Sequence, residues 1–185
     1  MTGQAETKTR ETWAIDPIHS SIEFAVKHMV IATVRGRFKK FDIDVDFDDA
    51  HPDQSRVGVR IDVASIDSRE PDRDTHLRSA DFFDVEKFPA MTFQNRQIEP
   101  RGDGRSRLIG DLTIKDVTRE VVLDAELNGP AKDPWGNQRF GVTAETSISR
   151  NDFGLAWNVA LETGGFLVGD SVKIFVEAEL VKQSR

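Results

Sequence analysis

Alternation of apolar and polar residues is the feature that most constrains the fold of this chain of 185 residues. In the last alternating segment, apolar side chains stand at every second position from Val172 to Leu180, with Lys173, Glu177 and Glu179 between them. Side chains of a β-strand point to its two faces in turn, so this period of two predicts a strand with one buried face. The same pattern recurs at residues 22–26, 57–63, 108–114, 117–127 and 140–148.

These segments predict an all-β protein. About eight antiparallel strands, mostly neighbours in sequence order, are typical of a single up-and-down β-barrel. We expect residues 12–182 to form this barrel and residues 1–11, which are polar, to form a flexible tail. The inward phase changes between Phe38 and Phe41, and a β-bulge at Lys39 and Lys40 would absorb that shift. Helical pattern is confined to short connectors at residues 28–33 and 72–79.

Residues 69–93 contain more apolar surface than an exposed connector needs. The segment begins with charged residues after Pro71 and continues with four phenylalanines around Pro89. A buried phenylalanine stabilises a fold by roughly 1.5–3 kcal/mol, so a segment of this kind should fold back onto the molecule. We expect it to cover one end of the barrel.

Composition and charge exclude several classes of function. The net charge of −7 disfavours nucleic acid as a partner, because binding to a phosphate backbone needs a basic face. The chain has no cysteine, which excludes disulfides and thiolate metal sites. No run of about 18 apolar residues predicts an integral membrane segment. The first dozen residues lack an apolar stretch typical of a secretion signal, so a cytoplasmic location is expected.

An eight-stranded barrel either fills its interior with side chains or leaves room for one small ligand. The inward positions predicted here are almost all aliphatic or aromatic. They favour a dry lumen, and they fit both a hollow and a close-packed interior.

Six segments in order resemble motifs of one known family: residues 13–24 (WAIDPIHSSIEF), 36–38 (GRF), 73–84 (RDTHLRSADFFD), 88–93 (FPAMTF), 110–114 (GDLTI) and 150–155 (RNDFGL). Together they resemble the YceI-like family over about residues 12–182. The resemblance implies a lipocalin-like barrel that binds a long isoprenoid or another amphiphilic chain, in proteins that are often secreted or periplasmic and often dimeric. The sequence Ile-Lys-Asp-Val at residues 114–117 stands where many members have Ile-His-Gly-Val, so any role of that histidine is lost here.

Candidate ligand-binding residues follow from strand phase and side-chain bulk. The lumen candidates are Phe24, Val26, Phe38, Phe93, Leu112, Phe140 and Ile174. Ordinary core packing explains each of them equally well. Connector residues expected to form a lid or mouth, or else an aromatic cluster that seals one barrel end, are Phe82, Phe83, Phe153 and Trp157.

The histidines were considered as metal ligands, catalytic groups and headgroup contacts. His19, His28 and His76 form no compact motif, and zinc sites need about three protein ligands, so we predict no metal. His28 and His76 are candidates for hydrogen bonds to a polar headgroup. For Arg150 we expect a turn-stabilising ion pair with Asp152.

The function predicted from the sequence is a carrier, or a sequestering protein, for a long-chain isoprenoid, quinone or fatty amphiphile. It needs no cofactor and no catalytic residue, and a homodimer is expected from the resemblance. Two alternatives remain open at this point. One is an enzyme acting on a hydrophobic substrate, with a histidine or Asp81 as acid–base. The other is a stress-linked interaction module whose barrel is filled.

Overall fold

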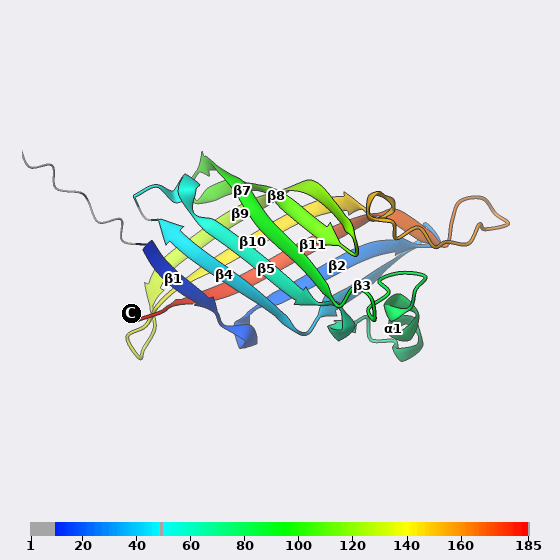
Figure 1. Cartoon of the computed structure of the whole chain (residues 1–185), viewed down its shortest axis with the longest axis horizontal. Helices are drawn as coiled ribbons and strands as arrows, with labels where there is room; N and C mark the ends of the chain where they lie inside the picture. Colours follow the sequence, from blue (N-terminus) through cyan, green and yellow to red (C-terminus); the bar gives the residue numbers. More distant parts are fainter. Residues whose placement is uncertain (1–9, 49, 185) are drawn as a thin grey trace, which may run out of the picture.

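The computed structural model describes residues 10–48 and 50–184 and consists mostly of β-strands (Figure 1). The strands are β1 (Arg10–Ile15), β2 (Ser21–His28), β3 (Ala32–Phe38), β4 (Phe41–Asp48), β5 (Arg56–Asp62), β6 (Ile66–Asp67), β7 (Ala90–Gly102), β8 (Arg105–Ile114), β9 (Val117–Lys132), β10 (Gln138–Ser149) and β11 (Val168–Lys182). Within these described ranges, one α-helix, α1 (Pro71–Arg78), and four 3₁₀ helices connect them: η1 (Pro17–His19), η2 (Pro52–Gln54), η3 (Val63–Ser65) and η4 (Arg150–Phe153).

The strands close into an antiparallel barrel with eight strand positions, which confirms the predicted fold class. Closure occurs where β1 pairs with the end of β11, while β2 pairs with an earlier part of the same strand. β1 and β2 therefore act as one long strand interrupted by η1. In the same way β3 pairs with β2, and β4 pairs with β1. β3 and β4 therefore occupy one strand position of the barrel between them.

The predicted bulge at Lys39 and Lys40 is a complete break between β3 and β4. Ser65 bridges it, since Lys39 N donates to the Ser65 carbonyl at 3.2 Å and Lys40 N donates to Ser65 Oγ at 2.9 Å. The sequence pattern places the phase shift correctly. A bulge would have required a continuous partner strand across the break. Here η1 interrupts the partner between β1 and β2, and on the other side β3 pairs with β6 whereas β4 pairs with β5.

The helix predicted at residues 28–33 is wrong, because residues 29–31 form the turn of the β2–β3 hairpin and the others belong to its two strands. His28 pairs with Ala32, and Ile31 N donates to the His28 carbonyl at 3.2 Å. Cross-strand pairing of β2 with β3 thus overrides the weak local preference of this apolar stretch.

The first strand begins at Arg10, inside the range predicted as a tail. Arg10 and Glu11 pair with Asp48 and Phe47 of β4, and Arg10 Nη1 lies 2.8 Å from Asp46 Oδ2. Residues 1–9, which make up the rest of the predicted tail, lie outside the described residues.

The predicted helix at residues 72–79 is present as α1. Pro71 occupies its first turn, where a missing N–H costs nothing, and the Glu70 side chain accepts from Arg73 N at 2.7 Å. Among the described residues, no helix combines the length and the apolar character that crossing a membrane requires.

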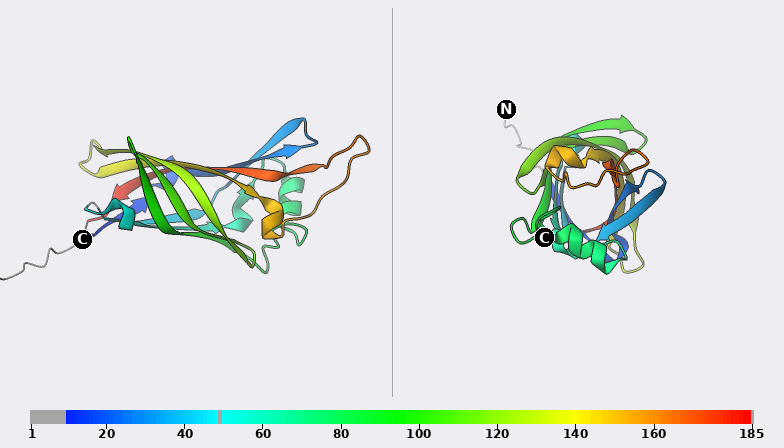
Figure 2. Two further views of the ribbon diagram at one scale, coloured as in Figure 1. Left: turned by 90° about the horizontal axis from the view of Figure 1, so that it is seen from above. Right: turned by 90° about the vertical axis from the view of Figure 1, so that its right-hand side faces the viewer.

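The apolar interior consists of two clusters, one towards each end of the barrel. Trp13, Phe140, Ile43, Val45 and Leu180 are buried in the cluster where the barrel closes on β1. The larger cluster lies towards α1 and η4, which Figure 2 shows at the opposite end of the barrel. This larger cluster contains the candidate site.

Candidate functional site

A cavity of about 160 Å³ lies inside the barrel, within the larger cluster. Inward side chains of strands from β2 round to β11 form its wall, as the alternation predicts. Eight of the residues singled out from the sequence border it: Phe24, Val26, Phe38, Phe82, Phe83, Phe93, Leu112 and Ile174.

The other five candidates lie outside the cavity wall. Phe140 belongs to the opposite cluster, where its ring meets Trp13 edge-on with centroids 4.4 Å apart. Phe153 is buried in η4, within the larger cluster but behind the wall. His28 ends β2, and His76 and Trp157 pack together at the covered end of the barrel.

α1 and the segment after it lie along the rim of one end of the barrel (Figure 2), and this end is the covered end. Leu77 of α1, with Phe82 and Phe83, contributes to the cavity wall. Buried Asp74 fixes the helix, because its carboxylate accepts from Ser68 N at 2.9 Å and from Ser68 Oγ at 2.5 Å. On the other side, Arg78 donates to the carbonyls of Ala64 and Ile66 at 2.9 and 3.0 Å. The sequence prediction that this segment folds back onto the barrel end is therefore correct.

An aromatic group surrounds His76 at this covered end. Its ring centroid lies 4.6 Å from that of Trp157 and 5.1 Å from that of Phe82, both in edge-on geometry. His76 Nε2 lies 2.8 Å from Asp81 Oδ2, at the exposed side of the group. A polar pair thus stands beside Phe82, which itself lines the cavity.

Arg150 does not pair with Asp152 as expected from the sequence. It is buried, and its guanidinium donates to main-chain carbonyls, including that of Gly169 at 2.8 Å and that of Trp157 at 3.0 Å. A further bond reaches the Leu155 carbonyl. Desolvation lowers the pKa of this guanidinium from its usual value. Its donors are satisfied by carbonyls of the loop after η4 and of the start of β11, which a two-residue spacing in sequence does not reveal.

The wall also contains residues that sequence reasoning did not select. They are Ile22, Val59, Ile61, Leu77, Met91, Ile114, Val121, Leu123, Ile148, Leu155, Val168, Val172 and Val176. Most of them point inward on the same strands as the selected candidates. Strand phase alone therefore identifies them, and the additional requirement for a bulky side chain excludes them. Leu77 faces the cavity from α1, and no strand pattern identifies it.

Few polar side chains border the cavity, and the neighbouring main chain uses their groups. Thr146 Oγ1 donates to the Val122 carbonyl at 2.8 Å, and the Arg150 nitrogens face carbonyls as described above. Glu23, the remaining charged residue, is exposed. The chemistry that this wall offers is therefore apolar contact.

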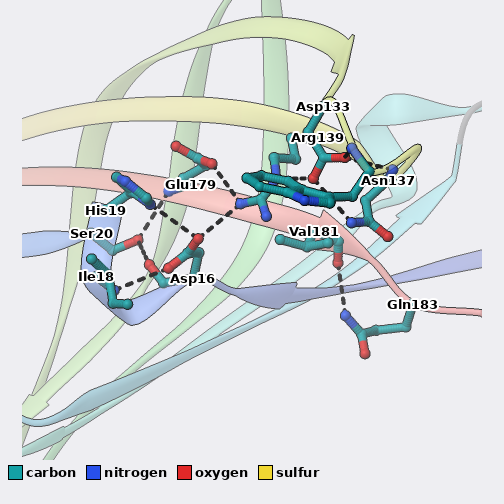
Figure 3. Close-up of polar contacts among 11 residues, drawn as sticks. Asp16, Ile18, His19, Ser20, Asp133, Asn137, Arg139, Glu179, Val181 and Gln183 are labelled. Carbon is teal, nitrogen blue, oxygen red and sulfur yellow. Dashed lines mark hydrogen bonds and ion pairs between the residues drawn. The ribbon is translucent and has the colours of Figure 1, made fainter.

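A polar network stands at the other end of the barrel (Figure 3). Arg139 Nη1 lies 2.8 Å from Asp16 Oδ2 and 2.7 Å from Glu179 Oε1, and Arg139 Nε lies 2.8 Å from Asp133 Oδ2. His19 Nδ1 lies 3.1 Å from Asp16 Oδ2. These bonds lower the pKa of Asp16 to about 2, chiefly through His19 and then Arg139, and Asp16 in turn raises the pKa of His19.

Asp16, His19 and Glu179 offer three ligand atoms within 4.8 Å of one another, which is compatible in spacing with a metal ion. The Arg139 guanidinium already occupies the space between the two carboxylates. A divalent cation would have to displace this fixed positive charge, so the network fits an ion-paired support of the barrel end better than a metal site.

Comparison with known proteins gives one consistent family. A model described as YceI-like domain matches residues 13–180. A UPF0312 protein of Staphylococcus epidermidis is 40% identical over 165 residues, which cover 89% of this chain and 94% of the relative. A UPF0312 protein of Vibrio cholerae is 40% identical over 137 residues, covering 74% and 72% of the two chains.

Solved structures agree with these relatives. BcnA of Burkholderia cenocepacia superposes with a TM-score of 0.76 at 26% identity, covering 89% of this chain and 98% of BcnA. A YceI protein of Campylobacter jejuni gives 0.73 at 32% identity, with coverages of 85% and 90%. A polyisoprenoid-binding domain from Saccharophagus degradans gives 0.70 at 12% identity, covering 92% and 98%, and at that identity it shows likeness of fold alone.

Proposed function

The chain belongs to the YceI-like family, and from this membership and its apolar cavity we propose that the barrel binds a long-chain isoprenoid or a similar amphiphilic lipid. The observation that carries the proposal is an apolar cavity inside a closed barrel, with α1 at the rim of one end and its Leu77 in the cavity wall. The polyisoprenoid-binding domain of Saccharophagus degradans, with the same fold, supports the choice of ligand class. Quinones and fatty amphiphiles fall within the same proposal.

The cavity volume determines how such a chain would bind. An engineered cavity of roughly 150 Å³ holds one molecule the size of benzene, and the volume here is about 160 Å³. A long chain therefore requires the barrel to widen. We propose that the rings of Phe24 and Phe83 turn aside, because both are half-buried and border the cavity. Each buried methylene would then contribute about 0.8 kcal/mol, less the cost of ordering the chain.

The polar headgroup would stay outside the apolar wall. We propose that it faces the covered end, where His76 and Asp81 offer hydrogen bonds beside Phe82 and Trp157. His28 remains a second candidate for this contact. A role in carrying or sequestering the lipid, a homodimer and a cytoplasmic location are parts of the same proposal, to be tested by lipid transfer, by mass in solution and by cell fractionation.

Mass spectrometry tests the proposal on freshly purified protein, as an organic extract and as the intact native chain. We expect a prenyl-type or other long-chain species near one per chain. Ile174→Asp should reduce the lipid-bound fraction at least about tenfold, because a carboxylate in an apolar cavity is strongly disfavoured. Lys173→Asp is the matched control, since Lys173 is the exposed neighbour on the same strand. Circular dichroism checks that both variants keep their strands.

Two results would contradict the proposal. One is a folded Ile174→Asp variant that carries as much lipid as the wild type. The other is a wild-type protein that stays empty after incubation with polyprenols and quinones, which would favour the filled interaction module.

The His76–Asp81 hydrogen bond favours one alternative, an enzyme acting on the bound chain with this pair as acid–base. A carrier and an enzyme differ in their response to His76→Ala. The enzyme would lose a pH-dependent turnover of the bound species, whereas a carrier converts the bound species neither in the wild type nor in the variant.

A further inference from the structure

The turn of the β2–β3 hairpin exposes apolar side chains where polar residues are the usual choice. Met29 and Val30 have φ values of 52° and 66°, and Ile31 N donates to the His28 carbonyl at 3.2 Å. This geometry is that of a type I′ turn, which Asn-Gly normally occupies because both central residues need a positive φ. A β-branched residue such as Val30 is costly there. Val30 is nevertheless 70% exposed and Ile31 is 82% exposed.

A second apolar segment lies beside this turn. The loop between η4 and β11 exposes Val159 and Phe166, and Met29 N donates to the Leu167 carbonyl at 2.8 Å. Figures 1 and 2 show the hairpin tip and this loop projecting at the same end of the barrel. We define the apolar tip as Met29, Val30, Ile31, Val159 and Phe166. Together they form a projecting surface rather than scattered apolar residues.

The charges around the apolar tip have the opposite sign to those of the whole chain. Residues 27–36 contain Lys27 and Arg35 and no acidic residue, whereas the net charge of the protein is −7. Arg37, further along β3, is paired with Asp67 at 3.4 Å and is not counted with them. Residues 156–167 add a single acid, Glu162. A basic tip on an acidic protein presents charge complementary to an anionic surface and repels that surface elsewhere.

The apolar tip is also continuous with the cavity wall. Val26 and Val168 line the cavity, and the backbone bond between Met29 and Leu167 lies just beyond them on the same two segments. A lipid that enters or leaves the cavity at this end would meet apolar side chains along its path.

We propose that the apolar tip docks on the surface of a lipid bilayer that contains anionic lipid. Apolar side chains enter the boundary between headgroups and acyl chains, and the basic residues of the hairpin face anionic headgroups. This placement puts the adjoining end of the cavity against the bilayer from which a lipid would be drawn. The inference rests on the proposed function for its purpose, and the binding itself is measured separately.

Flotation with vesicles tests the docking, using the full chain and vesicles of phosphatidylcholine with or without phosphatidylglycerol. The double substitution Val30→Asp with Ile31→Asp should weaken binding at least about tenfold, because it replaces inserted apolar groups with charges. The turn should survive, since aspartate adopts a positive φ more readily than valine. Trp135→Asp is the matched control, because Trp135 is 81% exposed in the β9–β10 turn at the opposite end (Figure 1).

Arg35→Glu separates charge from apolar insertion. It should weaken binding to the vesicles with phosphatidylglycerol by about fivefold or more, since one basic residue near an anionic surface contributes about 1 kcal/mol. Binding to phosphatidylcholine alone should stay within about twofold of the wild type.

Three results would overturn the docking. They are absence of wild-type binding to both kinds of vesicle, equal losses in the tip and Trp135 variants, and a dimer that the tip substitutions dissociate without any vesicle binding. Lipid content measured by mass spectrometry on the same samples distinguishes the two proposals. An empty wild-type protein that still binds vesicles through the apolar tip contradicts the proposed function alone, and a lipid-loaded protein that binds no vesicles contradicts the docking alone.

Discussion

The two ends of the barrel use the same alternating strands and fill their interiors differently. At the end closed by β1, Phe140 meets Trp13 and Phe47 with ring centroids 4.4 and 6.2 Å away. Towards α1, Phe24 and Phe83 are half-buried and border a cavity of about 160 Å³. Strand phase thus selects which side chains point inward, and the contacts among those side chains decide whether the interior closes.

The polar groups differ between the ends as well. At the end closed by β1, which we call the filled end, Arg139 is held by three carboxylates from segments far apart in the sequence. At the end towards α1, which we call the hollow end, Arg78 and Arg150 donate to main-chain carbonyls, including those of Ala64 and Gly169. The ion pairs of Arg139 connect separate segments at the filled end. At the hollow end, the hydrogen bonds of Arg78 and Arg150 hold α1 and the loop after η4 in place, but they do not cross the cavity. We expect the hollow end to open at a lower free energy than the filled end.

The largest expected effect is a difference in stability between equivalent substitutions at the two ends. Phe140→Ala should lower the free energy of unfolding by about 3–5 kcal/mol, because it leaves a cavity beside Trp13. Phe83→Ala should cost less than about 2 kcal/mol, since this ring is half-buried beside space that is already empty. Equilibrium urea denaturation of lipid-free protein measures both values. Equal losses would show that the ends do not differ in packing.

The second-largest expected effect concerns Gly36, which lies against the Phe24 ring at the hollow end. Gly36 pairs with Phe24 across β2 and β3, and a Cβ added there would lie 2.3 Å from Phe24 Cζ. Gly36→Ala should therefore push the ring aside, at a cost of about 1–3 kcal/mol, and change the space available to a ligand. We expect a lower lipid content per chain, measured by native mass spectrometry.

Gly58→Ala is the control for this prediction, because a Cβ at Gly58 would meet the flexible side-chain amide of Gln94 at 3.3 Å. Its lipid content should stay at the wild-type level. If Gly36→Ala retains as much lipid as Gly58→Ala, Phe24 does not control the cavity.

Much of the fold could be predicted from local pattern, because a period of two fixes the inward phase of each strand. The inward side chains of β11, and the return of residues 69–93 to the barrel end, follow from such patterns. The break at Lys39 and Lys40 was placed correctly but misinterpreted, since its form depends on Ser65, 25 residues away. The turn at Met29 and Val30 could not be predicted, because its residues contradict the usual preference of that turn.

The candidate site, like the fold, could be predicted where strand phase determines which side chains point inward. Phe24 and Ile174 border the cavity because strand phase places them there. Phe140 shares that phase, yet it lies in the filled end, since position along the barrel depends on strand pairing and tilt rather than on phase. Arg150 illustrates a further limit, because its carbonyl partners lie in the loop after η4 and at the start of β11, and no local pattern brings them together.

The smallest expected effect concerns pH at the filled end. The pKa of Asp16 is lowered to about 2 by hydrogen bonds with His19 and Arg139, so its contribution to stability is present above 3.8 and is lost as the pH falls towards 2. The pKa of His19 is raised by Asp16, so its contribution is present below 6.5 and is lost as the pH rises through the raised value. Water and salt screen the exposed His19 and, less strongly, the half-buried Asp16, which keeps both effects small.

Melting temperatures of the wild type, Asp16→Asn and His19→Gln across this pH range separate the two contributions. The wild type should exceed Asp16→Asn between pH 3.8 and 6.5, with the difference shrinking towards pH 2. His19→Gln should lack the small loss on the alkaline side. Lipid content should not follow this pattern, because the network belongs to the filled end and does not touch the cavity wall. A lipid content that changes in parallel with the Asp16 effect would show that the two ends are coupled.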